Sequence, residues 1–205
     1  MSTQKDTYKT LKEPGEETLF KEKGSKFFGY AFPVSTEDEI KTILENIKAQ
    51  HHQARHWCYA WQLGSRYENH RANDDGEPSN TAGMPIYGQL QSFELTNTLI
   101  IVVRYFGGTK LGVGGLITAY KTSAKLAIEA SNIVEKTIDE VFKIKFDYPL
   151  MNKVMRIVKD NEAQILKQDM TLNCIFTISI REKNAKKLKQ IFKDFYGVEL
   201  LKKNV

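Results

Sequence analysis

The sequence contains little cysteine and no long hydrophobic run. Its two cysteines, Cys58 and Cys174, are widely separated, which excludes a disulfide-rich scaffold and favours a reducing compartment. The longest apolar run, Leu99–Val103, is far too short to span a bilayer. The first six residues lack the apolar core of a secretory signal. We therefore expect a cytoplasmic protein without membrane association.

Internal repeats and low-complexity segments are also missing. The 205 residues are 41% hydrophobic and 27% charged, which is enough for a real core in one large or two modest domains. The net charge of +5 is uneven: residues 1–136 contain 16 Lys+Arg and 16 Asp+Glu, and residues 137–205 contain 14 and 9. This basic excess favours an acidic partner such as nucleic acid or an acidic protein surface, or else it is a solvated lysine-rich face.

Residues 1–136 are expected to form one α/β domain. The Lys23-Gly24 pair suits a hairpin turn, and Ser35 or Thr36 can cap the helix that follows. Residues 64–80 read as a polar loop, and residues 134–137 as a linker. The expected elements are strands over residues 17–22, 25–34, 56–63 and 99–103, and helices that begin near Ser35, Thr81 and Leu116, the last running to about Ile133.

Residues 137–205 predict a second domain with the order β-α-β-β-α-β, the ferredoxin-like arrangement. The expected elements are strands over residues 142–146, 163–167, 171–180 and 198–201, and helices that begin at Pro149 and include Leu188–Phe195. Five lysines fall on the last helix: Lys183, Lys186, Lys187, Lys189 and Lys193. The fold class is therefore α+β with two domains, residues 1–136 and 137–205.

A glycine-rich loop follows the apolar strand at Leu99–Val103 and opens a helix. Its glycines are Gly107, Gly108, Gly112, Gly114 and Gly115. Backbone N–H groups and the positive end of a helix dipole would then face an anion, with Arg104, Thr109 and Lys110 beside it. The alternative is that the glycines allow close packing of loop and helix. Neither the dinucleotide fingerprint nor a Walker A loop is present.

Other groups of polar residues give weaker signals. Asp74, Asp75 and Glu77 could hold a divalent cation, bond the loop backbone, or meet Arg104 or Lys110. The spacing of His51, His52, His56 and Cys58 matches no common zinc pattern. A triad of Ser79, His56 and Asp75 lacks a nucleophile elbow around the serine. We therefore expect no metal, no cofactor and no catalytic residue.

Three ordered blocks resemble the signatures of the bacterial YigZ proteins of the IMPACT family. They are His56–Ala60, Asp74–Ile86 and Val103–Leu116. Asn80 and Lys121 stand where the family pattern has glycine. The resemblance implies an N-terminal domain similar to the second domain of a small-subunit ribosomal protein. It also implies a C-terminal domain similar to a ferredoxin-like domain of elongation factor G.

The resemblance also implies a link to translation, because eukaryotic relatives compete with a kinase for its activator during starvation. We expect a non-enzymatic regulator that binds RNA or a ribosome-associated partner. The expected binding residues are Arg104, Gly107, Gly108, Thr109, Lys110, Gly112, Gly114, Gly115, His56, Asp74, Asp75, Glu77, Ser79 and Thr81. One alternative is an enzyme that acts on a phosphorylated small molecule or nucleotide with Mg²⁺. Another is a protein-interaction module that buries its two tryptophans and neighbouring aromatic residues at a partner surface. The sequence does not indicate an oligomeric state.

Overall fold

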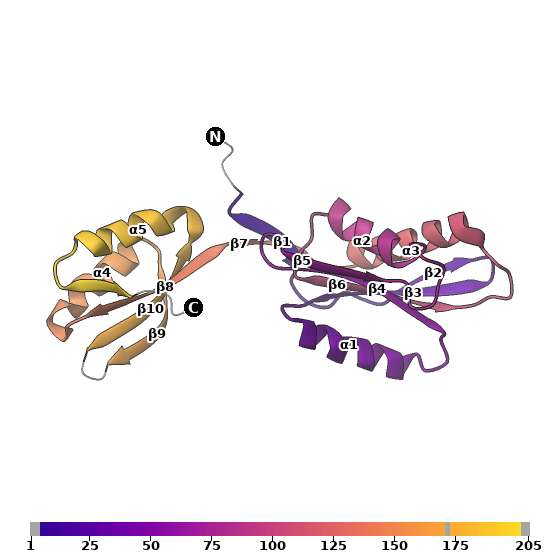
Figure 1. Ribbon diagram of the computed structural model, residues 1–205, viewed down its shortest axis with the longest axis horizontal. Coiled ribbons are helices and arrows are strands. Elements are labelled where there is room, and N and C mark those ends of the chain that lie inside the picture. The colour runs from indigo at the N-terminus through magenta and orange to yellow at the C-terminus, as the bar shows by residue number, and fades with distance from the viewer. Residues whose placement is uncertain (1–4, 171–172, 202–205) are drawn as a thin grey trace. The chain divides into compact units, whose positions relative to one another are not determined.

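The protein is a mixed α/β chain of two domains, and its computed structural model describes residues 5–170 and 173–201 (Figure 1). One compact unit is Tyr8–Lys136. The other runs from Thr137 onward and also includes residues 5–7, which the sequence assigned to the first domain. Each unit has its own hydrophobic core. The division into domains of residues 1–136 and 137–205 stays a prediction.

The larger unit is a five-stranded antiparallel sheet with helices on both faces. In spatial order its strands are β2 (Thr18–Glu22), β3 (Ser25–Pro33), β6 (Thr98–Tyr105), β4 (His56–Leu63) and β5 (Asn69–Asn73). The apolar run predicted as a strand lies in β6, at the centre of the sheet, where both of its faces are buried. Helices therefore have to cover the sheet on both sides.

Three helices provide this cover (Figure 1). Helix α1 (Glu37–Gln50) packs on one face through Ile40 and Ile47. Helices α2 (Gly83–Ser92) and α3 (Gly112–Glu129) pack on the other. Thr36 caps α1 in a capping box with Glu39, as one of the two expected caps.

The turn between β2 and β3 follows from local sequence, whereas strand β5 and the segment after α3 depend on pairing with other strands. Lys23 and Gly24 both have positive φ (45° and 79°), as the tight turn between β2 and β3 requires. Strand β5 lies inside the segment expected to be a polar loop. Its polar sequence gives no strand pattern, and it is a strand because its backbone pairs with β4. Helix α3 ends at Glu129, and the expected linker is part of β7 (Ile133–Thr137), which pairs with β1 (Thr7–Leu11).

The smaller unit has the predicted element order. It contains β8 (Asp139–Phe146), a 3₁₀ turn at Tyr148–Leu150, α4 (Met151–Asp160), β9 (Gln164–Met170), β10 (Cys174–Arg181), α5 (Glu182–Asp194) and β11 (Val198–Leu201). The sheet order is β11-β8-β10-β9, and every pair is antiparallel. Thr171, predicted as the start of the third strand, lies outside the described residues. The likeness to particular ribosomal-protein and elongation-factor domains stays a prediction.

A bidentate ion pair joins Asp6 to Arg181 in the smaller unit, with N–O distances of 2.6 and 2.9 Å. The hydrogen bond from Arg181 lowers the pKa of the Asp6 carboxyl below its usual value of about 3.9. A carboxyl with a lowered pKa stabilises the folded state fully above its unfolded pKa, and this contribution disappears as pH falls through the folded pKa.

We therefore expect the chain carrying Asp6→Asn to show a weaker loss of stability below about pH 3.9 than the parent chain. Urea unfolding followed by far-UV circular dichroism at a series of pH values measures this difference. Asp160→Asn, on an exposed pair with Arg156 at 3.6 Å, is the matched control. Parallel pH profiles for the parent and Asp6→Asn would contradict the expectation.

Candidate functional site

The acidic loop between β5 and α2 is built around Asp74. Its Oδ1 accepts the backbone N–H groups of Ala82 (2.9 Å) and Gly83 (2.8 Å), and its Oδ2 accepts that of Asn80 (2.9 Å). Ala82 is the N-cap of α2 and makes no side-chain capping bond of its own. The Asp74 carboxylate therefore satisfies the first N–H groups of α2 and complements the positive end of its dipole.

Asp75 ties the same loop to the start of β4. Its Oδ2 accepts the backbone N–H of Trp57 at 2.7 Å. Its carbonyl oxygen lies 2.9 Å from Nδ1 of His56, and because a carbonyl only accepts, Nδ1 is the protonated ring nitrogen. Both aspartates thus have the backbone-bonding role that the sequence offered as one alternative.

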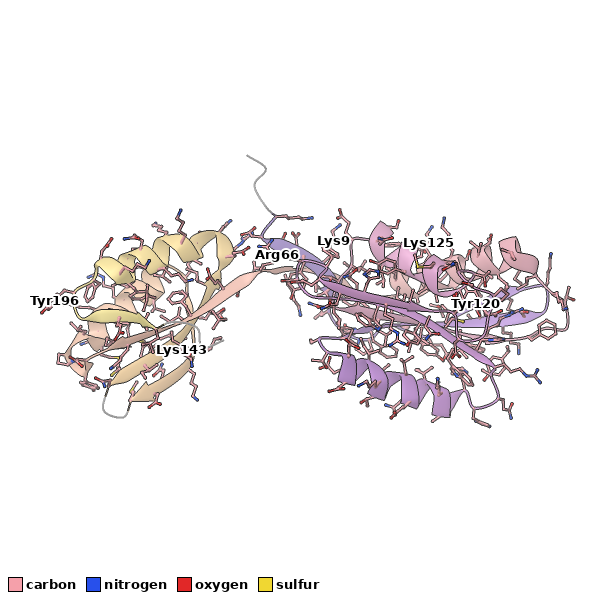
Figure 2. The ribbon with its side chains drawn as sticks, in the orientation of Figure 1. Lys9, Arg66, Tyr120, Lys125, Lys143 and Tyr196 are labelled. Carbon is pink, nitrogen blue, oxygen red and sulfur yellow. The ribbon has the colours of Figure 1, made fainter. Side chains whose placement is uncertain are left out.

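Glu77 and Arg104 form a buried ion pair. The Oε1 of Glu77 accepts from Nη1 of Arg104 at 2.6 Å, and the two side chains are 4% and 7% exposed. The same oxygen accepts the hydroxyl of Tyr120 at 2.7 Å, and Cys58 Sγ lies 3.3 Å from that hydroxyl. Tyr120, labelled in Figure 2, belongs to α3, and its side chain is buried in the core between this helix and the sheet. The predicted contact between the acidic loop and a basic residue is therefore made with Arg104.

Burial affects the titration of two groups in this cluster. It raises the pKa of the Cys58 thiol and of the Tyr120 hydroxyl well above their usual values. A thiol needs its thiolate form to act as a nucleophile, so Cys58 is inert at neutral pH. The cluster is a support that joins β4, β6, α3 and the acidic loop.

Arg104 lies near the end of β6, shortly before the glycine-rich loop in the chain. Its guanidinium carbon lies 5.6 Å from the ring centroids of Phe27 and Phe106. Its Nε is buried and has no hydrogen-bond partner among the described residues. Phe106 itself is 57% exposed and leads into the loop. The guanidinium is thus held by Glu77 and the two aromatic rings, and its buried Nε–H is left without a partner among the described residues.

Gly107 packs against the hairpin turn between β2 and β3. A Cβ on Gly107 would lie 1.8 Å from the backbone carbon of Gly24 and 2.1 Å from the nitrogen of Ser25. The Gly107 N–H donates to Ser25 Oγ at 3.2 Å. Gly107 therefore has the packing role that the sequence offered as the alternative to anion binding.

The remaining glycines of the loop behave differently. Gly108 and Gly112 have φ of 87° and 73°, which L side chains rarely adopt. A Cβ added at Gly115 would lie 3.1 Å from the Cβ of Leu111, which is a tight contact. A Cβ on Gly114 would meet nothing within 4 Å, and its φ is ordinary, so neither packing nor conformation requires glycine there.

The start of α3 is the exposed part of this site. Its N-cap, Leu111, makes no side-chain capping bond, and its first turn contains no acidic residue. Thr109, Lys110, Val113 and Gly114 are exposed around it. This helix end can therefore receive an anion on its backbone N–H groups.

The structure divides most of the predicted site residues between two groups, a buried support and an exposed loop. His56, Asp74, Asp75, Glu77 and Arg104 form the hydrogen-bonded support. Thr81 is buried and donates to the carbonyl of Pro78 at 2.6 Å, and Ser79 is exposed in the acidic loop. Gly108, Thr109, Lys110, Gly112 and Gly114 form the exposed loop. These contacts place the three sequence blocks at the same end of the sheet.

Several residues of the site were not identified from the sequence. Ser25 and Gly24 hold the loop, Tyr120 and Cys58 complete the buried cluster, and Lys23 is exposed in the turn beside Gly107. The turn itself was recognisable, but its contact with a segment some eighty residues later required the sheet. On α5, Lys183, Lys186, Lys187 and Lys193 are exposed, and Lys189 pairs with Glu140.

The histidines give no metal centre. Within residues 5–170 and 173–201, His, Cys, Asp and Glu side chains form no group of three that could hold a metal ion. His51 is buried between the hydroxyls of Tyr30 (2.5 Å) and Tyr105 (3.0 Å), away from His56 and Cys58. No helix in the described part of the chain is long and apolar enough to cross a membrane.

Fold and site together define a class of two-domain α/β protein whose larger domain presents a glycine-rich loop on a buried carboxylate–guanidinium pair. The family model of the Impact N-terminal domain matches residues 23–128, and this chain belongs to the IMPACT family.

Its relatives include IMPACT family member YvyE of Bacillus subtilis, 36% identical over 179 residues, which are 87% of this chain and 82% of the relative. IMPACT family member YigZ of Escherichia coli is 30% identical over 149 residues, 72% of this chain and 73% of the relative. A crystal structure of a hypothetical protein matches with a TM-score of 0.75 and 24% identity, covering 97% of this chain and 98% of that one. That match shows the fold of both domains.

Proposed function

We propose that this protein is a non-enzymatic regulator linked to translation that binds RNA phosphate at the glycine-rich loop. The observation that carries the proposal is the uncapped start of α3, with Gly114 open to close approach and Lys110 beside it. The link to translation is supported by membership of the IMPACT family.

The basic smaller domain would add affinity without reading sequence. Four exposed lysines on α5 can contact phosphates, and such contacts act through charge. The enzymatic alternative requires Asp74, Asp75 or Glu77 to be available for Mg²⁺. Each of these carboxylates already accepts hydrogen bonds from the protein, so the geometry favours binding over catalysis.

Replacing Gly114 with aspartate is expected to weaken RNA binding by about tenfold or more while leaving the fold intact. The new carboxylate would occupy the anion position, and an acidic residue in the first turn stabilises a helix by about 0.3–1 kcal/mol. Fluorescence anisotropy of a labelled single-stranded fragment of ribosomal RNA, titrated with the full chain at several salt concentrations, measures the affinity.

The matched variant Gly114→Ala adds a Cβ without charge, so its RNA affinity separates the effect of side-chain volume from the effect of the negative charge. Lys110→Ala should reduce the slope of log affinity against log salt by about 0.7, the value for one contact to a single strand. Unchanged affinity in Gly114→Asp, or binding that does not respond to salt, would rule out the loop as the RNA site.

A further inference from the structure

The outer face of α2 and α3 contains a groove that the proposed RNA site does not use. Its volume is about 520 Å³, and it is lined by Pro85, Gly88, Phe93, Ile117, Lys121 and Lys125. Lys125, labelled in Figure 2, lies on the side of the helix pair that faces away from the sheet. The groove is therefore open along two helices of the same domain.

Gly88 has no structural reason to be glycine. It lies in the interior of α2, its φ is not positive, and an added Cβ would meet nothing within 4 Å. Glycine in a helix interior costs about 0.5–1 kcal/mol relative to alanine. The missing side chain leaves room for the backbone of a bound molecule to approach the groove.

Apolar and basic residues are separated along the α3 side of the groove. Val113, Ile117, Lys121 and Lys125 recur at four-residue spacing and so lie on one helix face. Val113 and Ile117 are 60% and 38% exposed, and Met84 at the start of α2 is 46% exposed. Lys125 lies 3.5 Å from the exposed carboxylate of Glu129, and Lys121 is also exposed. One end of this face is apolar and the other is positively charged.

We propose that the α2/α3 groove binds an acidic amphipathic helix of a partner protein. Apolar side chains of that helix would cover Ile117 and Val113, and its carboxylates would meet Lys121 and Lys125. Docking of an apolar helix face into a groove between helices is a common mode of peptide recognition. An RNA strand would satisfy the lysines but would leave the exposed apolar side chains uncovered, so the observations favour a protein segment.

The variants that test the groove, Gly88→Gln and Lys121→Glu, change no residue of the RNA site, so each proposal can fail alone. The probe for the groove is a synthetic helical peptide with leucines three and four residues apart and glutamates on both flanks. A second peptide carries lysine in place of every glutamate. Titration of the isotope-labelled full chain, followed by amide chemical shifts, locates binding, and anisotropy of the labelled peptide measures the dissociation constant.

We expect the acidic peptide to shift the amides of Gly88, Ile117 and Lys121, and the basic peptide to leave them unchanged. Gly88→Gln fills the groove and Lys121→Glu reverses its charge, so each should weaken the acidic peptide by at least about tenfold, or 1.4 kcal/mol. Lys41→Glu, at an exposed lysine of α1 on the opposite face of the sheet, is the control and should bind like the parent.

Circular dichroism and thermal unfolding verify that Gly88→Gln is folded, and a good helix former in place of glycine should not lower its stability. Three results would overturn the proposal: no shifts with the acidic peptide, equal binding of both peptides, or parent-like affinity in Gly88→Gln and Lys121→Glu. Shifts of the groove amides by the ribosomal RNA fragment alone would also overturn it, because the occupant would then be nucleic acid.

Discussion

Replacing Glu77 with alanine is expected to lower the free energy of unfolding by about 3–5 kcal/mol. Arg104 would then be a buried cation without its carboxylate, since its side chain is only 7% exposed. The hydroxyl of Tyr120 would lose its acceptor at the same time. This loss is a large fraction of the stability of a whole domain, which is about 5–15 kcal/mol.

Urea unfolding followed by tryptophan fluorescence measures this loss, because Trp57 and Trp61 both lie in the larger domain. Glu129→Ala is the matched control, since its pair with Lys125 is exposed at 3.5 Å and such pairs contribute about 0–1 kcal/mol. The double change Glu77→Leu with Arg104→Met should recover much of the loss, because it removes both charges. A loss in Glu77→Ala no larger than in the control would contradict the expectation.

Replacing Phe176 with alanine is expected to destabilise the smaller domain by about 3–5 kcal/mol. Phe176 is fully buried, and its ring packs edge-on against Phe146 with centroids 5.0 Å apart. The cavity would lie in a core to which the larger domain contributes no residue. We therefore expect two separate transitions in the variant, with far-UV circular dichroism detecting the smaller domain and tryptophan fluorescence the larger.

Leu166→Ala is the control for this experiment, because Leu166 belongs to the same sheet but is 56% exposed. It should shift neither transition measurably. If the fluorescence transition of Phe176→Ala moved together with the circular dichroism transition, the two domains would unfold as one unit. The division into independent domains would then be wrong.

Local sequence pattern predicted most elements because each carries its own physical signal. The apolar run in β6 predicted a buried strand, the Lys23-Gly24 pair predicted a turn, and Ser35 or Thr36 was expected to cap α1, where Thr36 does so. Strands β1, β5 and β7 were not predicted from the sequence. Residues of β5 and β7 are polar or exposed, and the strands form through pairing of β5 with β4 and of β7 with β1.

In the candidate site, too, the sequence identified residues whose roles only the tertiary structure could assign. The sequence singled out Arg104, Glu77 and the glycines, and for the glycines it offered both anion binding and close packing as roles. It could not distinguish Gly107, which packs on Gly24, from Gly114, which faces open space, because the difference lies in the neighbours and not in the residue.

The sequence by itself determined the two-domain α/β organisation, the family and the location of a glycine-rich loop before a helix. These follow from hydrophobic periodicity, turn chemistry and ordered motifs, which are local properties of the chain. The tertiary structure alone decided which charges are paired and buried, which glycines are free, and where α2 and α3 leave a groove. Those properties depend on side chains brought together from distant segments, and burial then decides which of them are available for binding.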